Sequence, residues 1–154
     1  SKADDIKNAR NTLTQRVQGP LSTATTEMDL AGLRDGNVAG MGIFEFPYAY
    51  IAVEQRDGAR RLVMCNDGKE IDAFPLPAGQ QTVWIRVFAT DRDFKANFFY
   101  SLDGSTFHPF GNVLQMGLGL PWTANRFALF NFSTTEQGVG GWADFNWFRM
   151  AGSR

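Results

Sequence analysis

The stretch NRFALFNFSTTEQGVGGWADFNWFRM, residues 125–150, decides the fold of this chain. It consists of two aromatic-rich runs joined by a polar loop that ends in glycines. In the first run Phe127 and Leu129 alternate with Ala128 and Phe130, and the second run has the same period of two. This period predicts two β-strands with large residues on both faces, so other parts of the chain have to cover both faces.

The rest of the chain has the composition and turn signals of an all-β protein. Its 154 residues fit one domain over 1–154, and 14 Phe, 4 Trp and 16 Gly favour strands and tight turns over helices. Asp57-Gly58 and Asp103-Gly104 each separate alternating segments, as hairpin turns do. We predict an irregular arm over 1–10 and strands over 11–17, 24–30, 38–46, 48–55, 60–65, 70–74, 82–89, 95–101, 106–110, 126–132 and 142–150.

Charge, hydropathy and cysteine count exclude several classes of function. Fifteen basic and sixteen acidic residues give a net charge of −1, without a basic run that follows a phosphate backbone, so we expect no nucleic-acid partner. No apolar window reaches the roughly 18–20 residues that span a bilayer, so we expect no membrane partner. Cys65 is the single cysteine, and we expect it to be a small buried hydrophobe. The compartment stays open among extracellular, periplasmic and cytoplasmic.

The sequence contains no motif that identifies a catalytic residue. His108 is the single histidine and stands beside Pro109 at a predicted strand end, which is typical of a surface residue. A glycosidase needs two carboxyl groups about 5–10 Å apart. We therefore predict no catalytic residue in this chain, and we keep a small self-contained glycosidase as an alternative. The carboxylates that this alternative would draw on are Glu27, Asp29, Glu45, Glu54 and Asp144.

Aromatic residues near turns indicate carbohydrate binding, because sugar rings stack on aromatic rings while nearby polar groups bind the hydroxyls. Phe46 and Tyr48 flank Pro47, which lacks a ladder donor and favours a turn or sheet edge with at least one ring pointing outward. Trp122 stands in a predicted loop, and Trp142 follows the glycine loop. We predict that Trp122, Tyr48, Phe46 and Trp142 form the candidate carbohydrate-binding set.

The sequence indicates a candidate metal site at one place only, at residues 144–146. Asp144 and Asn146 supply oxygens beside a predicted strand, and a structural calcium is the ion that such oxygens favour. Calcium takes six to eight oxygen ligands. The two residues are thus a partial calcium site, and no other cofactor is expected.

Seven motifs in a fixed order carry a resemblance to a known family. The chain resembles the C-terminal concanavalin A-like β-sandwich of family-43 glycoside hydrolases, the β-xylosidase and α-L-arabinofuranosidase group. The resemblance implies a jelly-roll sandwich of two antiparallel sheets, lacking N-terminal strands of the full family domain. The motifs are ARNTLTQR from Ala9 with Gly19-Pro20, MDL from Met28 with DGNVAG from Asp35, YAYIAV from Tyr48, FYSLDG from Phe99, LQM from Leu114, RFALFN from Arg126 and DFNWFR from Asp144.

The same resemblance implies where catalysis and sugar contact lie. In the family the catalytic carboxylates belong to a five-bladed propeller that precedes the sandwich, and a sandwich loop reaches toward its pocket with an aromatic ring. The matching loop here is Leu120–Asn125, where the family commonly reads Leu-Pro-His-Phe and this chain carries Leu-Pro-Trp-Thr. Missing strands leave an unpaired sheet edge and an apolar groove, which favours association with another segment or chain.

Three hypotheses follow. The first is a non-catalytic accessory sandwich that packs on the catalytic propeller of an enzyme acting on xylan-derived or arabinose-bearing oligosaccharides and helps to shape its sugar site. The second is an autonomous carbohydrate-binding module for xylan-like chains, and the third is the self-contained glycosidase. The expected partners are the propeller or the missing N-terminal strands, xylo-oligosaccharide or xylan, and a second copy of the chain.

Overall fold

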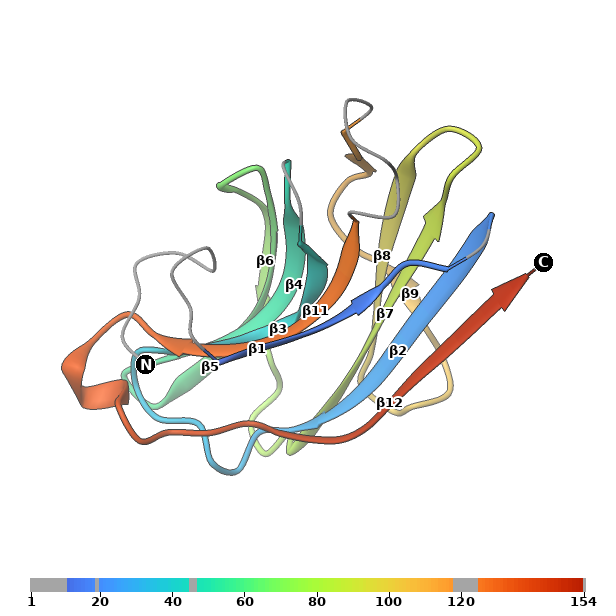
Figure 1. The fold of residues 1–154 in the computed structure, drawn as a ribbon. Helices are drawn as coiled ribbons and strands as arrows, with labels where there is room; N and C mark the ends of the chain where they lie inside the picture. Colours follow the sequence, from blue (N-terminus) through green and yellow to red (C-terminus); the bar gives the residue numbers. More distant parts are fainter. Residues whose placement is uncertain (1–10, 19, 45–46, 118–124, 154) are drawn as a thin grey trace.

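Two antiparallel β-sheets face each other in a computed structural model that describes residues 11–18, 20–44, 47–117 and 125–153 (Figure 1). The predicted arm over 1–10 lies outside the described residues. The all-β, concanavalin A-like sandwich expected from the sequence is confirmed. No helix of the described residues is long and apolar enough to cross a membrane.

The first sheet, called here the β3 sheet, has the order β1-β11-β3-β4-β5-β6. Its strands are β1 (Thr12–Arg16), β11 (Arg126–Ser133), β3 (Asn37–Phe44), β4 (Ala49–Arg56), β5 (Ala59–Asn66) and β6 (Lys69–Pro75). The second, the β7 sheet, has the order β10-β8-β7-β2-β12, with β9 paired to β8. Its strands are β10 (Leu114–Gln115), β8 (Lys95–Ser101), β7 (Thr82–Thr90), β2 (Leu21–Asp29), β12 (Asp144–Ser153) and β9 (His108–Pro109).

The two strands of the opening stretch separate into different sheets. β11 pairs with β3 over residues 126–133, while β12 pairs with β2 and carries a bulge between Phe145 and Trp147. A 3₁₀ turn, η3 (Glu136–Gly138), lies in the polar loop between them, capped by the Thr135 side chain, which accepts from Gly138 N. The loop therefore crosses from one layer to the other, and each aromatic strand is covered on its inner face by the opposite sheet.

Turn chemistry fixes the hairpins. Asp57 and Gly58 both have positive φ, 51° and 73°, and join β4 to β5 in register. Gly104 also has positive φ, 80°, but the connection between β8 and β9 is longer than a two-residue turn. The short strand β10 was absent from the sequence prediction, because two residues carry no period that a pattern could reveal.

The core lies between the sheets. On β7 the alternate residues Val83, Ile85 and Val87 are fully buried, and they face Met41 and Ile51 of the β3 sheet within one cluster. Other inner residues that are fully or nearly fully buried include Ala24, Met28, Leu30, Ile43, Val53, Leu62, Met64, Phe98, Leu114 and Phe127. Such a core, continuous across both layers, is what holds the sheets at their spacing.

A second apolar cluster covers the outer face of the β3 sheet. Phe130 and Phe132 of β11 stack at 5.8 Å, and the Tyr50 ring meets the Phe130 ring edge-on at 5.1 Å. Phe130 pairs with Gly40, whose missing side chain leaves room beside the neighbouring strand. Large residues on both faces of β11 are thus explained: one set fills the inner core and the other fills this outer cluster.

Candidate functional site

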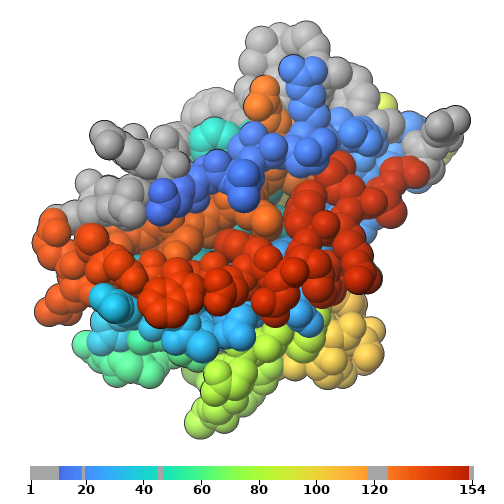
Figure 2. All heavy atoms as spheres, turned by 60° about the horizontal axis from the view of Figure 1, so that its bottom comes forward, coloured from blue at the N-terminus to red at the C-terminus, as the bar shows by residue number. Residues whose placement is uncertain are grey.

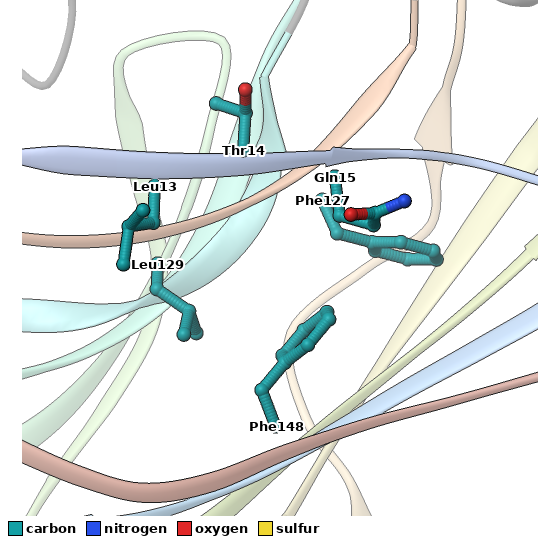
Figure 3. Close-up of a pocket in the computed structure, with 6 residues that line it drawn as sticks. All are labelled: Leu13, Thr14, Gln15, Phe127, Leu129 and Phe148. Carbon is teal, nitrogen blue, oxygen red and sulfur yellow. The ribbon is translucent and has the colours of Figure 1, made fainter.

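The sandwich is open along one side. β1 is the last strand of the β3 sheet and β12 the last strand of the β7 sheet, and a groove lies between these two edges. Figure 2 shows the blue atoms of β1 and the red atoms of β12 running side by side, with orange atoms of β11 between them. We call this groove the β1–β12 groove; it is lined by Leu13, Thr14, Gln15, Phe127, Leu129 and Phe148 (Figure 3).

The groove is apolar and holds about 210 Å³. Leu13 is 75% exposed although it stands opposite Leu129 in the β1–β11 ladder. In Figure 3 the Leu13, Leu129 and Phe148 side chains point into the same space from three strands. An adjoining hollow continues along the edge past Ala143 and Phe145. Burial of one leucine side chain stabilises a protein by about 1.5–3 kcal/mol. A segment that covers the groove would therefore gain binding free energy from burying these side chains.

Backbone pairing is open at the same place. Within the described residues, β1 pairs only with β11 and β12 pairs only with β2. An edge strand with unpaired N–H and C=O groups is a template for another strand. The apolar groove and unpaired edge expected from the sequence are therefore present in the described part of the chain.

Two of the four predicted sugar-binding aromatics, Tyr48 and Trp142, lie in the described part of the chain. Phe46 and Trp122 lie outside the described residues. Pro47 stands in a bend, as expected, but Tyr48 is only 4% exposed and its ring stacks near that of Tyr50, at 6.4 Å. The ring of Tyr48 therefore belongs to the outer apolar cluster. Pro47 indicates a turn, but it does not indicate on which side the ring of the next residue packs. Carbohydrate binding by this set stays a prediction.

Trp142 is the one described member of that set with a solvent-exposed ring, at 51%. Its backbone N–H donates to the Gly32 carbonyl oxygen at 2.9 Å. The indole lies on Gly32, where an added Cβ would stand 2.3 Å from the Trp142 Cε2 atom. The ring is thus packed against the Gly32 backbone on one side and exposed to solvent elsewhere. A ring that stacks on a sugar needs such a fixed, exposed surface.

The proposed calcium ligands do not fit an ion. Asp144 begins β12, and the Asn146 side-chain amide donates to Glu27 Oε2 at 2.8 Å. Among the residues that the structure describes, no three His, Cys, Asp or Glu side chains are grouped to hold a metal. Two oxygens fall far short of the six to eight that calcium takes, so no role here is assigned to calcium.

Three of the carboxylates weighed for catalysis have structural partners, while Asp144 is exposed and stands opposite Asp29 in the β12–β2 ladder. Glu54 accepts from Arg61 at 2.9 Å, and Glu27 accepts from the indole N–H of Trp84 at 3.1 Å and from Asn146. Asp29 accepts from the backbone N–H of Ala31 at 2.8 Å. Glu45 lies outside the described residues. None of the described partners is the second carboxyl that glycoside hydrolysis needs.

Cys65 and His108 also have structural surroundings. His108 is exposed on β9, 5.4 Å from the Tyr100 ring. Cys65 was expected to be buried, but it is half-buried on the outer face of the β3 sheet beside Tyr50. Burial raises the pKa of the Cys65 thiol and also that of the Tyr50 hydroxyl. A thiol with a raised pKa is a poor nucleophile at neutral pH.

Comparison with known proteins defines the class. Residues 2–151 match the family of the beta-xylosidase C-terminal concanavalin A-like domain, named for glycoside hydrolase family 43. The chain therefore belongs to this family of C-terminal β-sandwich domains, as the sequence motifs indicated.

Individual relatives are much longer proteins. A beta-xylosidase of Formosa agariphila is 28% identical over 152 residues, which are 94% of this chain and 24% of that protein. A bifunctional GH43-CE protein of Bacteroides eggerthii is 37% identical with a TM-score of 0.89, over 98% of this chain and 20% of its own. A GH43 enzyme engineered for endo-xylanase and exo-arabinofuranosidase activity is 30% identical with a TM-score of 0.89, over 98% and 33%. The chain thus spans a fifth to a third of these relatives.

Proposed function

We propose that this chain is the non-catalytic accessory sandwich of a family-43 glycoside hydrolase acting on xylan-derived or arabinose-bearing oligosaccharides. Two observations support this. The family is that of a C-terminal domain, and its relatives named as glycoside hydrolases are three to five times longer than the matched region. Of the carboxylates weighed for catalysis, Glu27, Asp29 and Glu54 are engaged in hydrogen bonds or ion pairs with structural partners.

The β1–β12 groove carries the proposal. We infer that it receives the rest of the enzyme, either a surface of the catalytic five-bladed propeller or the N-terminal strands expected from the family. The apolar lining supplies the energy, because covering Leu13, Leu129 and Phe148 removes hydrocarbon surface from water. The free edge of β1 supplies backbone partners for an added strand.

Shaping of the sugar site belongs to the same proposal. The family resemblance gives this part to the loop Leu120–Asn125, whose Trp122 would supply the ring. That loop precedes β11 directly, and β11 forms the floor of the β1–β12 groove. Asn125, the described end of this loop, accepts a hydrogen bond from the Val17 N–H just after β1 at 3.1 Å, which ties the end of the loop to the edge strand of the groove.

Mixing experiments test the proposal. The purified chain and a separately produced family-43 propeller, each at tens of micromolar, are expected to co-elute from a size-exclusion column with light-scattering detection. Separate elution of the two proteins would contradict the proposed packing. A stable homodimer of the chain alone, lost on Leu13→Asp, would instead assign the groove to a second copy.

A second candidate, autonomous binding of xylan-like chains, is favoured by one observation. Trp142 combines 51% exposure with a ring fixed against the Gly32 backbone. Neutral xylan in a native gel is expected to retard the unaltered chain and to leave Trp142→Ala unretarded. Equal migration of both proteins with and without xylan would remove this candidate.

A further inference from the structure

The outer face of the β7 sheet carries two rows of side chains that neither the groove nor the proposed function uses. In the first row Trp147 of β12, Glu27 of β2 and Trp84 of β7 are successive cross-strand partners. Residues in register across neighbouring strands share a face. Because Ile85 and Val87 face the core, the side chain of Trp84 faces outward.

The first row is held in place by hydrogen bonds. The Trp84 indole N–H donates to Glu27 Oε1 at 3.1 Å, and the Asn146 amide donates to Glu27 Oε2 at 2.8 Å. Both oxygens of this carboxylate are therefore occupied by neutral donors. Trp84 and Trp147 are half-buried, so each ring has one part packed on the sheet and one part open to solvent.

The second row is positively charged. Arg149 of β12 and Arg86 of β7 flank Thr25 of β2, which places their Cα atoms about 10 Å apart at the usual strand spacing. The Arg149 guanidinium lies over the Trp147 ring at 4.5 Å. The Arg86 guanidinium lies over the Phe107 ring at 3.7 Å, and its Nε donates to Thr25 Oγ1 at 3.0 Å. Aromatic rings thus pre-orient both cations.

Neither guanidinium has a carboxylate partner among the described residues. The ion pairs of the described chain involve Arg61 with Glu54 and Glu70, and Lys95 with Asp93. Glu27 is the single carboxylate in the two rows, and its oxygens are already bound. These two rows therefore offer two oriented cations and one carboxylate whose oxygens are both hydrogen-bonded, while the carboxylates of the next row, Asp29 and Asp144, lie beyond Glu27 and away from the arginines.

We propose that this face binds a carboxylate-bearing polysaccharide, with a uronate held by Arg86 and Arg149 and sugar rings in contact with the solvent-exposed parts of Trp84 and Trp147. Guanidinium groups recognise carboxylates in bidentate geometry, and tryptophan rings stack on sugars. A protein partner would require apolar area to bury. The rings on this face, Trp84, Phe88, Phe99 and Trp147, are half-buried and interleaved with arginine, glutamate and threonine side chains, so a glycan is the better fit.

The test compares one polysaccharide before and after loss of its charge. In affinity gel electrophoresis, glucuronoxylan is expected to retard the chain at least tenfold more strongly than the same xylan after reduction of its carboxyl groups. Retardation is expected to weaken severalfold as NaCl rises, because exposed ion pairs are screened over about 10 Å at 0.1 M salt. Polygalacturonate serves as a second source of uronate. If it retards the chain, the site recognises uronates in general; if only glucuronoxylan retards the chain, the site recognises uronates carried on xylan.

Matched variants locate the site. Arg149→Gln, at an exposed position, and Arg86→Gln are each expected to lower the affinity for glucuronoxylan at least tenfold. Arg56→Gln, an exposed charge on the other sheet, removes the same charge and is expected to bind as the parent does. Near-ultraviolet circular dichroism checks that each variant is folded.

Three results would overturn the proposal. They are equal retardation by native and carboxyl-reduced xylan, unchanged binding by both arginine variants, and no retardation by either acidic polysaccharide. A fourth result, weaker binding of the propeller to Arg149→Gln than to the unaltered chain, would identify the face as a protein interface and would also overturn the proposal. Failure of the propeller to bind leaves this experiment unaffected, because it uses the chain alone.

Discussion

The indole of Trp142 lies directly on the backbone of Gly32. A Cβ at position 32 would stand 2.3 Å from Trp142 Cε2, so the ring keeps its place only because residue 32 has no side chain. The contact joins the β2–β3 connection to the start of β12, across the end of the sandwich. It also gives the exposed ring a fixed orientation.

Gly32→Ala is expected to displace the indole and to lower the free energy of unfolding by about 1–2 kcal/mol, because overpacking forces the ring to move. Urea titration and the tryptophan emission spectrum measure both effects. In a Trp142→Ala background the same substitution is expected to cost little, since the clash is gone. Gly152→Ala is the control, because its added Cβ would meet no atom closer than 3.4 Å. An equal cost in both backgrounds would refute the contact.

Arg61 is a second point where a single substitution is informative. Its guanidinium reaches Glu54 Oε2 at 2.9 Å and Glu70 Oε2 at 2.7 Å, and the Glu54 side chain is only 11% exposed. Arg61→Ala is expected to destabilise the fold by about 1–3 kcal/mol, because it leaves a nearly buried carboxylate unpaired. Arg56→Ala, at an exposed position, is expected to change stability by less than about 0.5 kcal/mol. Equal effects of the two substitutions in a urea titration would contradict this assignment.

Asp103 shapes the connection after β8. Its carboxylate accepts from the backbone N–H groups of Thr106 and Ser105, each at 2.8 Å, and from the Ser101 hydroxyl at 2.9 Å. These hydrogen bonds, led by that of Thr106, lower the pKa of Asp103 to about 2. Because the folded pKa lies below the unfolded value, the associated stability is present above about pH 4 and is lost as the pH falls toward 2.

An NMR titration of the carboxyl carbon is expected to find the Asp103 midpoint near 2 and to find it higher in Ser101→Ala, which lacks one donor. Asp103→Asn is expected to remove this part of the acid dependence of stability. A midpoint near the ordinary aspartate value of about 3.9 would contradict the hydrogen-bond pattern.

Cys65 is expected to react slowly with thiol reagents at pH 7, because burial raises its pKa and reduces the thiolate fraction. The rate of reaction with a chromogenic disulfide measures this directly. The chain unfolded in guanidinium chloride serves as the control and is expected to react at least tenfold faster. Equal rates in the two states would show that the thiol is open and unperturbed.

Much of the fold could be predicted from the sequence, and the reasons are local. Period-two runs and Asp-Gly turns placed the strands that became β4, β5 and β7 within a few residues. β10 was missed because its two residues are paired only through tertiary contact with β8. Tyr48 was predicted as a candidate sugar-binding ring, and its ring is buried in the outer cluster, since long-range packing decided its direction.

The candidate site could be predicted in part. Large residues on both faces of residues 126–132 indicated covering on two sides, and the family resemblance indicated an open edge. The cationic row of Arg86 and Arg149 could not be foreseen, because its members are 63 positions apart in the chain and meet only through the register of β7, β2 and β12. The alternation along β7 indicated on which face of the sheet Arg86 lies, but it did not indicate which residues of β2 and β12 lie beside it.

Isothermal titration of a family-43 propeller into this chain measures the proposed packing without any other component. Binding at tens of micromolar or tighter is expected, weakened at least tenfold by Leu13→Asp in the β1–β12 groove. Val139→Asp, which changes another exposed hydrophobic residue away from the groove lining, is predicted to bind normally. Absence of binding, or equal binding by both variants and the parent, would contradict the claim that this open edge receives the catalytic part of the enzyme.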